Sequence, residues 1–260
     1  MSLRVCQIKA LARLSVLELY RRKDLIVVFV LCAVILLPLM VFTPFGVSGA
    51  SRYVNEMALL LVWLFSLVIG LGVSARLFPP EFESRTIYPM LSKPVARGTV
   101  LAGKYAGALA ASVSALAVFY VAYGLLAGVR QGVWFPVVLV QAFVLHIGFL
   151  AVVTALGLLG SLVLTPSANL TMTGLTVIGM LFFGQRLPAL AAAQAWPGRT
   201  VLTLLHWFGP HVEFFDLRQR VVHEWPPIGW EVCLAVLAYA AVYAAVCLMV
   251  AAFAFRNKRF

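Results

Sequence analysis

Charged side chains are scarce in this sequence. Asp, Glu, Lys and Arg make up 11% of its 260 residues, whereas hydrophobic residues make up 63%. A soluble domain is about 25% charged and about 45–50% apolar, so this composition excludes an ordinary soluble domain. Apolar runs of about 18 residues or more recur along the chain, and such runs are candidate membrane-spanning helices. The composition therefore predicts an all-α integral membrane protein.

Cysteine and acidic residues are also few, and their placement excludes several kinds of site. The four cysteines form no C-x-x-C pair, which argues against a disulfide framework of the secreted type. No Ser–His–Asp arrangement and no paired carboxylates occur within the apolar runs, so we predict neither an enzyme nor a proton-coupled carrier. The basic N-terminal residues lack a small-residue cleavage site, so we expect no cleavable signal peptide.

Two patterns look like ligand sites but lack essential parts. The stretch "GTVLAGKY", residues 98–105, matches the start of a phosphate-binding loop. Tyr105 stands where that loop needs Ser or Thr to hold magnesium, and no buried strand precedes it. Five candidate metal ligands precede the last apolar run without tight ligand spacing: His206, His211, Glu213, Asp216 and His223. We therefore expect neither a cofactor nor a metal bound by this chain.

Six apolar runs are predicted to span the membrane. Prolines separate several of them, because proline removes a backbone donor and disfavours helix just before it. The predicted spans are Leu25–Phe42, Met57–Phe78, Val100–Ala127, Val133–Leu164, Leu170–Gly184 and Ile228–Ala254. An even number of spans places both termini on the same side of the membrane.

The basic residues indicate which side that is. With both termini inside, the inner segments hold 14 of the 20 Lys and Arg residues. Because Lys and Arg accumulate in cytoplasmic segments, both termini are predicted to be cytoplasmic. The N-terminal helix of residues 1–24 would then lie at the cytoplasmic membrane surface, residues 79–98 would form a cytoplasmic loop, and residues 185–227 would be external. We expect short helices in the external segment, with three interfacial tryptophans: Trp196, Trp207 and Trp225.

Two polar side chains lie inside the fourth predicted span, Gln141 and His146. Ionisable groups at membrane depth are functional candidates, but polar side chains there also join helices by hydrogen bonds. Both alternatives stay open: a place on a transport pathway, or a role in helix packing. The helix-to-helix hydrogen bond is the interpretation we favour for His146.

The charged stretch between the second and third spans carries a family resemblance. "EFESRTIYPMLSKPVARGTVLAGKYAG", residues 81–107, resembles the cytoplasmic loop and following span of type-two ABC exporter permeases. Shared features are a Glu, a Thr, an apolar turn, a Lys-Pro-Val-x-Arg run and a Gly-Lys pair. Arg85 stands where the family usually has a small residue. "ELYRRKDLIVVFVL" (18–31) and "GPHVEFFDLRQRVVH" (209–223) are also similar, the latter to the subgroup that includes the permease for nitrous oxide reductase maturation.

The resemblance covers the whole chain, residues 1–260, as one permease domain. It implies the transmembrane subunit of an ABC exporter in the bacterial inner membrane, with a translocation pathway and no catalysis of its own. It also implies several partners: a second copy in a homodimer, two separate ATPase subunits that bind ATP and magnesium, membrane lipid, and a periplasmic accessory protein. No nucleic acid is expected.

Within this family, the loop would form a coupling helix over residues 81–92 that seats in a groove on the ATPase. The residues then expected to contact the ATPase subunit are Glu81, Glu83, Arg85, Thr86, Ile87, Met90, Leu91, Lys93 and Arg97. Two alternatives remain open at this stage. The stretch is a solvated loop without a partner, or the chain is a membrane assembly or scaffold protein that transports nothing.

Overall fold

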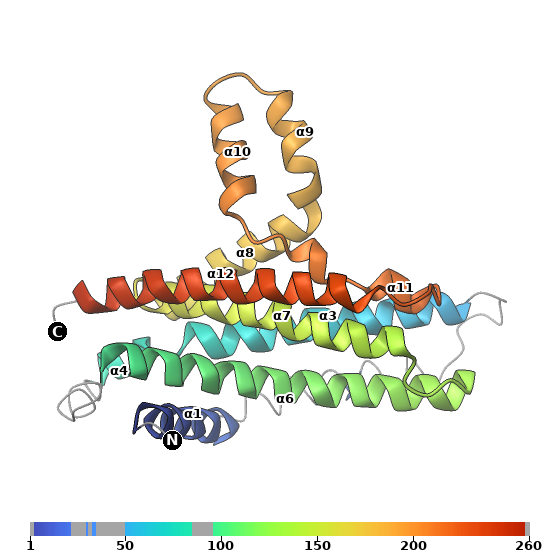
Figure 1. Ribbon diagram of the computed structural model, residues 1–260, viewed down its shortest axis with the longest axis horizontal. Coiled ribbons are helices and arrows are strands. Elements are labelled where there is room, and N and C mark those ends of the chain that lie inside the picture. Colours follow the sequence, from blue (N-terminus) through green and yellow to red (C-terminus); the bar gives the residue numbers. More distant parts are fainter. Residues whose placement is uncertain (1–2, 22–29, 31–32, 35–49, 85–95, 258–260) are drawn as a thin grey trace.

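The computed structural model of the chain describes residues 3–21, 30, 33–34, 50–84 and 96–257. Over these residues the fold is helical and contains no strand, which confirms the predicted all-α class. Long helices lie side by side and give the molecule an elongated shape (Figure 1). They are α3 (Ala50–Ala75), α6 (Arg97–Gln131), α7 (Val137–Ser161) and α12 (Trp230–Asn257), with α8 (Pro166–Phe183) packed against α3 and α7.

Five described segments are long and apolar enough to cross a membrane. They are Arg52–Glu83, Arg97–Val129, Val137–Ser161, Pro166–Ala192 and Trp230–Arg256. These segments correspond to the second to sixth predicted spans, so the chain is a multi-pass membrane protein. The first predicted span, Leu25–Phe42, lies almost entirely outside the described residues.

The limits of α7 and α8 differ from those predicted, and local backbone chemistry explains why. The predicted fourth span began at Val133, but Gly132 ends α6 in the left-handed region with a φ of 73°, and Pro136 directly precedes α7. Glycine adopts this conformation without steric cost, so it commonly ends helices. The predicted fifth span began at Leu170, but α8 begins at Pro166. Thr165 caps it with a side-chain oxygen, and proline suits the first helical position.

The prolines after the second span have a different role from the one predicted. We expected Pro79 and Pro80 to end this span, but α3 already ends at Ala75. The two prolines instead begin a separate short helix, α4 (Pro79–Glu83). Their missing N–H groups cost nothing there, because the first N–H groups of a helix have no intrahelical acceptor.

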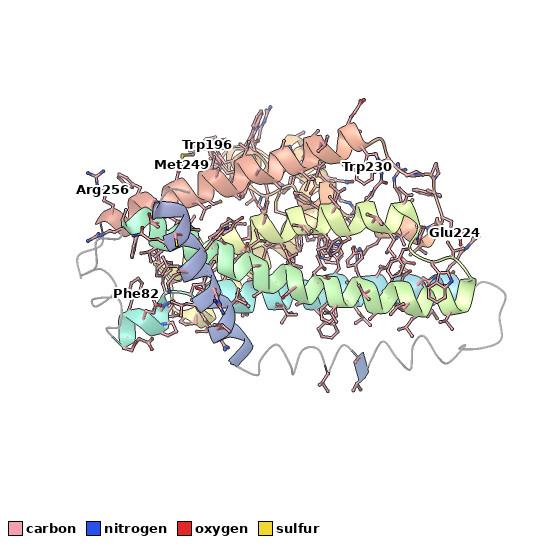
Figure 2. The ribbon with its side chains drawn as sticks, turned by 60° about the horizontal axis from the view of Figure 1, so that its bottom comes forward. Phe82, Trp196, Glu224, Trp230, Met249 and Arg256 are labelled. Carbon is pink, nitrogen blue, oxygen red and sulfur yellow. The ribbon has the colours of Figure 1, made fainter. Side chains whose placement is uncertain are left out.

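The N-terminal helix α1 (Leu3–Arg21) crosses α6, and small residues permit the contact. Figure 2 shows α1 lying obliquely over α6 near the end that carries Phe82 and Arg256. A Cβ atom added at Gly103 would lie 2.6 Å from the Cβ atom of Leu11, and one at Gly107 would lie 2.8 Å from the carbonyl oxygen of Ala12. The Gly-xxx-Gly spacing therefore lets the two backbones approach closely, as in other membrane helix pairs.

Short helices occupy most of the segment between α8 and α12. They are η2 (Gly184–Arg186), α9 (Leu187–Ala192), α10 (Gly198–Phe208), η3 (Val212–Phe215) and α11 (Arg218–Val222). Helices α9 and α10 pack on each other as a hairpin that projects from the side of the bundle (Figure 1). The hairpin exposes large apolar side chains, and Trp196 and Trp207 are among the most exposed.

The second half of this segment returns to the bundle. Phe215 of η3 is buried and its ring lies 6.4 Å from that of Phe149, at the middle of α7. A Cβ atom added at Gly148 would lie 3.0 Å from the Phe215 ring. The segment predicted to be external thus reaches the centre of the helix bundle instead of staying at its end.

Candidate functional site

The root of the predicted coupling loop is α4, which is joined to α6 by an ion pair. The Nζ of Lys104 lies 2.5 Å from a carboxylate oxygen of Glu81. Only 6% of the Lys104 side chain and 24% of the Glu81 side chain are exposed. Two opposite charges withdrawn from water in this way hold their helices together, because separating them leaves an uncompensated charge.

Lys104 has further contacts that fix its position. Its Nζ donates a hydrogen bond of 2.8 Å to the carbonyl oxygen of Leu77, in the turn between α3 and α4. The same nitrogen lies 4.7 Å from the centre of the buried Phe78 ring, within the range of a cation–π contact. One lysine of α6 therefore contacts both the turn that follows α3 and α4.

The residues of α4 that face away from this ion pair are accessible. Glu83 and Ser84 are exposed, and the Ser84 hydroxyl donates to the carbonyl oxygen of Pro80 at 2.6 Å. The two predicted contact carboxylates thus differ in their surroundings. Glu81 faces the interior of its own chain, whereas Glu83 is placed at the surface.

Arg97, the last of the predicted contact residues, lies at the start of α6 and binds the end of α12. Its guanidinium donates to the carbonyl oxygens of Phe255 and Arg256 at 3.0 and 2.9 Å. It also lies 5.8 Å from the centre of the Phe255 ring. The last carbonyl groups of a helix lack intrahelical donors, so Arg97 supplies them and ties α12 to α6.

The other predicted contact residues lie outside the described part of the chain. They are Arg85, Thr86, Ile87, Met90, Leu91 and Lys93. The structure therefore places the two flanks of the predicted loop, α4 and the start of α6, at the same end of the bundle as the C-terminal residues of α12 (Figures 1 and 2).

A second group of polar side chains is buried inside the bundle around His146. The Nε2 of His146 lies 2.7 Å from the Ser66 hydroxyl of α3, and its Nδ1 lies 3.2 Å from the Tyr120 hydroxyl of α6. The Ser66 hydroxyl donates its only proton to the carbonyl oxygen of Trp63 at 2.8 Å. His146 therefore carries its proton on Nε2 and accepts at Nδ1, so a neutral imidazole satisfies all three groups.

Charged residues of the returning segment lie next to this group. Arg218 forms a two-pronged ion pair with Asp216, with N–O distances of 2.9 and 2.7 Å. Its guanidinium carbon lies 5.3 Å from the centre of the Trp63 ring, which in turn packs on His146. Pairing with Asp216 and contact with an aromatic face both compensate the Arg218 charge for lost hydration.

Gln141, the other polar residue predicted in the fourth span, joins α7 to the start of the last span. Its amide nitrogen donates to the carbonyl oxygen of Ile228 at 2.7 Å, and its amide oxygen accepts from the Ile228 N–H at 3.1 Å. Both backbone groups of a residue outside helix α12 are thereby satisfied. Gln141 and His146 are both fully buried and bond to other elements of the fold.

The histidines considered as metal ligands do not form a cluster with carboxylates or cysteines. In the described ranges, no three His, Cys, Asp or Glu side chains gather closely enough to hold a metal ion. The rings of His206 and His211 lie 4.8 Å apart, whereas His223 packs against Trp225.

Sequence reasoning missed the partners of several site residues. Lys104 and Glu81 both belong to the stretch that carries the family resemblance, but the sequence alone did not predict that they form an ion pair. Ser66 and Tyr120 were not singled out, although a hydroxyl inside an apolar run is itself a signal of interhelical hydrogen bonding. Asp216 and Arg218, two residues apart, were also not recognised as an ion pair.

Comparison with known proteins identifies the family. The model of the ABC-2 family transporter proteins matches residues 10–258, which is nearly the whole chain. No curated protein matches the sequence. The family match agrees with the resemblance carried by residues 81–107 and with the multi-pass helical fold. This chain therefore belongs to the ABC-2 family of transporter proteins and is a membrane-spanning permease component of an ABC transporter.

Proposed function

We propose that this chain is the permease subunit of an ABC exporter, and that the segment beginning at α4 transmits movement from separate ATPase subunits. Membership in the ABC-2 family supports the permease role and association with ABC ATPases. Export, two ATPase subunits that bind ATP and magnesium, and a homodimer in the bacterial inner membrane are the finer parts of this proposal. The subgroup around the nitrous oxide reductase maturation permease is proposed on sequence resemblance alone.

The observation that carries the coupling proposal is the Glu81–Lys104 ion pair. A lever that transmits force must be joined firmly to the spans that it moves. Glu81 lies in α4, and Lys104 lies in the second turn of the long helix α6. A displacement of α4 by a partner would therefore be passed to α6 and, through the hydrogen bond to Leu77, to the end of α3.

Arg97 extends this connection to the last helix. Because it binds two carbonyl groups at the end of α12, the other flank of the loop is joined to a second span. Lys104 and Arg97 thus attach the two flanks of the loop to the bundle. Glu83, on the exposed side of α4, remains available for contact with an ATPase subunit.

A photocrosslinking amino acid at position 83 tests this assignment. The full-length chain carrying the probe at Glu83 should form a covalent adduct with an ABC ATPase subunit in native membranes, identified by mass spectrometry. The same probe at Glu231, at the opposite end of the bundle, is the matched control and should form none. An adduct at Glu231 but not at Glu83 would contradict the proposed docking end.

Two sets of substitutions test the contact energetically. Loss of one partner from a desolvated charge pair typically costs about 2–5 kcal/mol of binding, so Glu83→Ala should weaken copurification of the ATPase and lower ATP turnover of the assembled complex. Replacing Met90 and Leu91 by Asp should have a larger effect, because it places charge in the predicted apolar contact. Wild-type assembly and turnover in both variants would show that the stretch is a solvated loop. That result would also be compatible with a scaffold protein that transports nothing.

A further inference from the structure

A cavity opens at the end of the bundle opposite α4, where the α6–α7 connection meets α11 and the residues that follow it. Its volume is about 190 Å³, and its lining includes Tyr123, Leu139, Arg220 and Glu224. Figure 2 places Glu224 at the end opposite Phe82, near Trp230 at the start of α12. In a chain whose long helices cross the bilayer, this end lies at the level of lipid headgroups.

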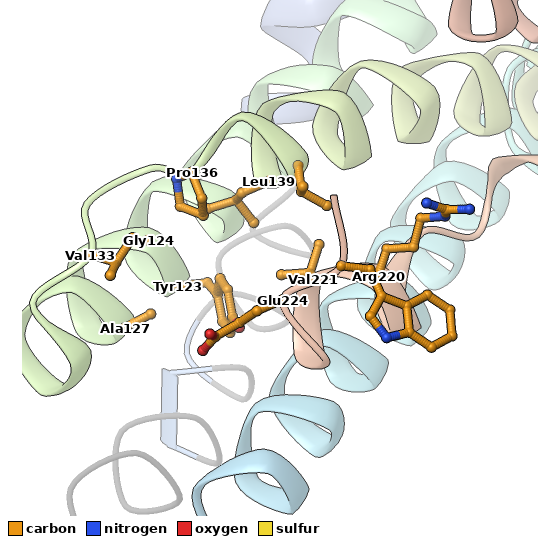
Figure 3. A pocket seen from close by; sticks show the side chains of 11 residues that line it. Tyr123, Gly124, Ala127, Val133, Pro136, Leu139, Arg220, Val221 and Glu224 are labelled. Atoms are coloured by element: carbon orange, nitrogen blue, oxygen red, sulfur yellow. The ribbon is translucent and has the colours of Figure 1, made fainter. Parts of the chain in front are cut away.

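Two side chains of opposite charge stand on different sides of the cavity. The Glu224 carboxylate lies beside Tyr123, whereas the Arg220 guanidinium lies on the far side of Val221 (Figure 3). Glu224 is exposed and forms no ion pair with any described residue. Its φ of 54° is unusual for a residue with a side chain, and such conformations persist where the surrounding structure imposes them.

Arg220 is held in place but keeps most of its hydrogen-bonding capacity. One terminal nitrogen donates to the carbonyl oxygen of Pro226 at 3.2 Å, and the guanidinium carbon lies 5.8 Å from the centre of the Trp225 ring. A guanidinium has five N–H groups, so donors remain for an anionic ligand group. The fork geometry of those donors matches a phosphate.

An apolar groove lies next to this cavity, between α6 and the start of α7. It encloses about 240 Å³ and is lined by apolar or aromatic side chains, including Val121, Phe135, Leu139 and Val140. Leu139 lines both spaces, so the cavity and the groove are adjacent. Val121 and Val140 are 49% and 43% exposed and face away from the bundle, where lipid surrounds the protein.

The connection between α6 and α7 shapes the boundary of the two spaces. Phe135 has a φ of 45° and packs flat against α6 at Gly124, where an added Cβ atom would lie 2.5 Å from its ring. The ring thereby forms one wall of the groove, and Pro136 next to it lines the cavity. The chain thus places a cavity that carries two charged side chains next to an apolar groove, which suits a lipid headgroup and an acyl chain.

We propose that this composite site holds one phospholipid whose headgroup bears a primary ammonium, as in phosphatidylethanolamine. One acyl chain lies in the groove along Val121 and Val140. The ammonium donates to the Glu224 carboxylate over the face of Tyr123, and the phosphate accepts from Arg220. The assignment goes beyond the proposed transport function and requires neither an ATPase partner nor a particular orientation in the membrane.

The two charges select this headgroup over the common alternatives. A trimethylated amine, as in phosphatidylcholine, has no N–H group to donate to Glu224. An anionic headgroup, as in phosphatidylglycerol, brings no cation to Glu224 and places a second anion close to it. A headgroup with both an ammonium and a phosphate satisfies Glu224 and Arg220 together.

Lipid titration followed by native mass spectrometry tests the headgroup assignment. The full-length chain in mild detergent is titrated with phosphatidylethanolamine, phosphatidylcholine and phosphatidylglycerol of identical acyl chains. The first lipid should bind most tightly, and Glu224→Gln should weaken it roughly tenfold or more, the scale expected for one hydrogen bond to a charged group. Phosphatidylcholine binding should change little. Glu231→Gln is the matched control, since it removes a nearby carboxylate that does not line the cavity.

A second pair of variants tests the groove. Val121→Trp should fill it and weaken all three lipids, whereas Val118→Trp should not, because Val118 is similarly exposed on the same helix but does not line the groove. Both positions are at the surface, and the unfolding temperature of each variant checks that the fold is kept. Equal binding of the three lipids by the wild-type chain, or an unchanged preference in Glu224→Gln, would overturn the headgroup assignment. Unchanged binding in Val121→Trp would overturn the acyl-chain assignment.

Discussion

Lys104 of α6 and Glu81 of α4 form an ion pair of 2.5 Å beneath the surface of one end of the bundle. The pair joins α4, at the end of the candidate span Arg52–Glu83, to the next span. The stretch that carries the family resemblance, residues 81–107, thus contains both partners of the contact that attaches the predicted coupling segment to α6.

Removing the lysine should therefore destabilise this end of the protein. A fully buried pair broken on one side costs about 3–5 kcal/mol, but Glu81 is partly exposed, so we expect about 1–3 kcal/mol for Lys104→Met. Reversible unfolding in detergent measures the change. The double variant Glu81→Gln/Lys104→Met should lose less than the sum of the two single variants, because neither change then leaves a charge without its partner. Additive losses would show that the pair is not coupled.

The contact between α1 and α6 should be sensitive to a single methyl group. Gly107→Ala places a Cβ atom 2.7 Å from the Ser15 Cβ and 2.8 Å from a backbone oxygen of α1, neither of which moves easily. We expect a loss of about 1–3 kcal/mol and faster hydrogen exchange in α1, as for other overpacked contacts. Gly98→Ala in the same helix meets no atom within 4 Å and is the matched control. Equal exchange of α1 in both variants would contradict the proposed packing.

His146 should contribute to stability through its two interhelical hydrogen bonds. His146→Leu leaves the Tyr120 hydroxyl without its acceptor and Ser66 without a donor. Interhelical hydrogen bonds in membranes contribute about 0.6 kcal/mol each and at most about 1.7, so we expect a loss of about 1–3 kcal/mol. Thr176→Val is a useful comparison, because the Thr176 hydroxyl bonds only within α8. Lost transport with unchanged stability in His146→Leu would instead favour a place on the pathway.

The orientation predicted from the basic residues can be tested by labelling from outside the cell. A cysteine at Gln219 should react with a membrane-impermeant reagent in intact cells, whereas one at Ser84 should react only after lysis. Both side chains are exposed, so a difference reports the side of the membrane and not burial. The reverse pattern would place α4 outside and rule out its contact with a cytoplasmic ATPase.

Local sequence chemistry determined the class of the fold and most of its helices. Long apolar runs must form hydrogen-bonded helices in a membrane, because lipid offers no partner for backbone N–H and C=O groups. The same rule does not determine the residues at which each helix begins and ends. Thr165 and Pro166 start α8 earlier than its apolar run suggested, and Pro79 and Pro80 start a helix instead of ending one.

The partners of the polar residues were decided only by the tertiary structure. Sequence identified His146 as unusual because a histidine is costly within an apolar span, but Ser66 and Tyr120 reach it from other helices. Likewise, the charge of Glu81 was evident, yet its pairing with Lys104 follows from how α4 folds back on α6. Hydropathy and helix signals act over a few residues, whereas these contacts depend on which helix faces meet. The close contact of α1 with Gly103 and Gly107 of α6 is of the same kind, because the residues that meet there lie far apart in the sequence.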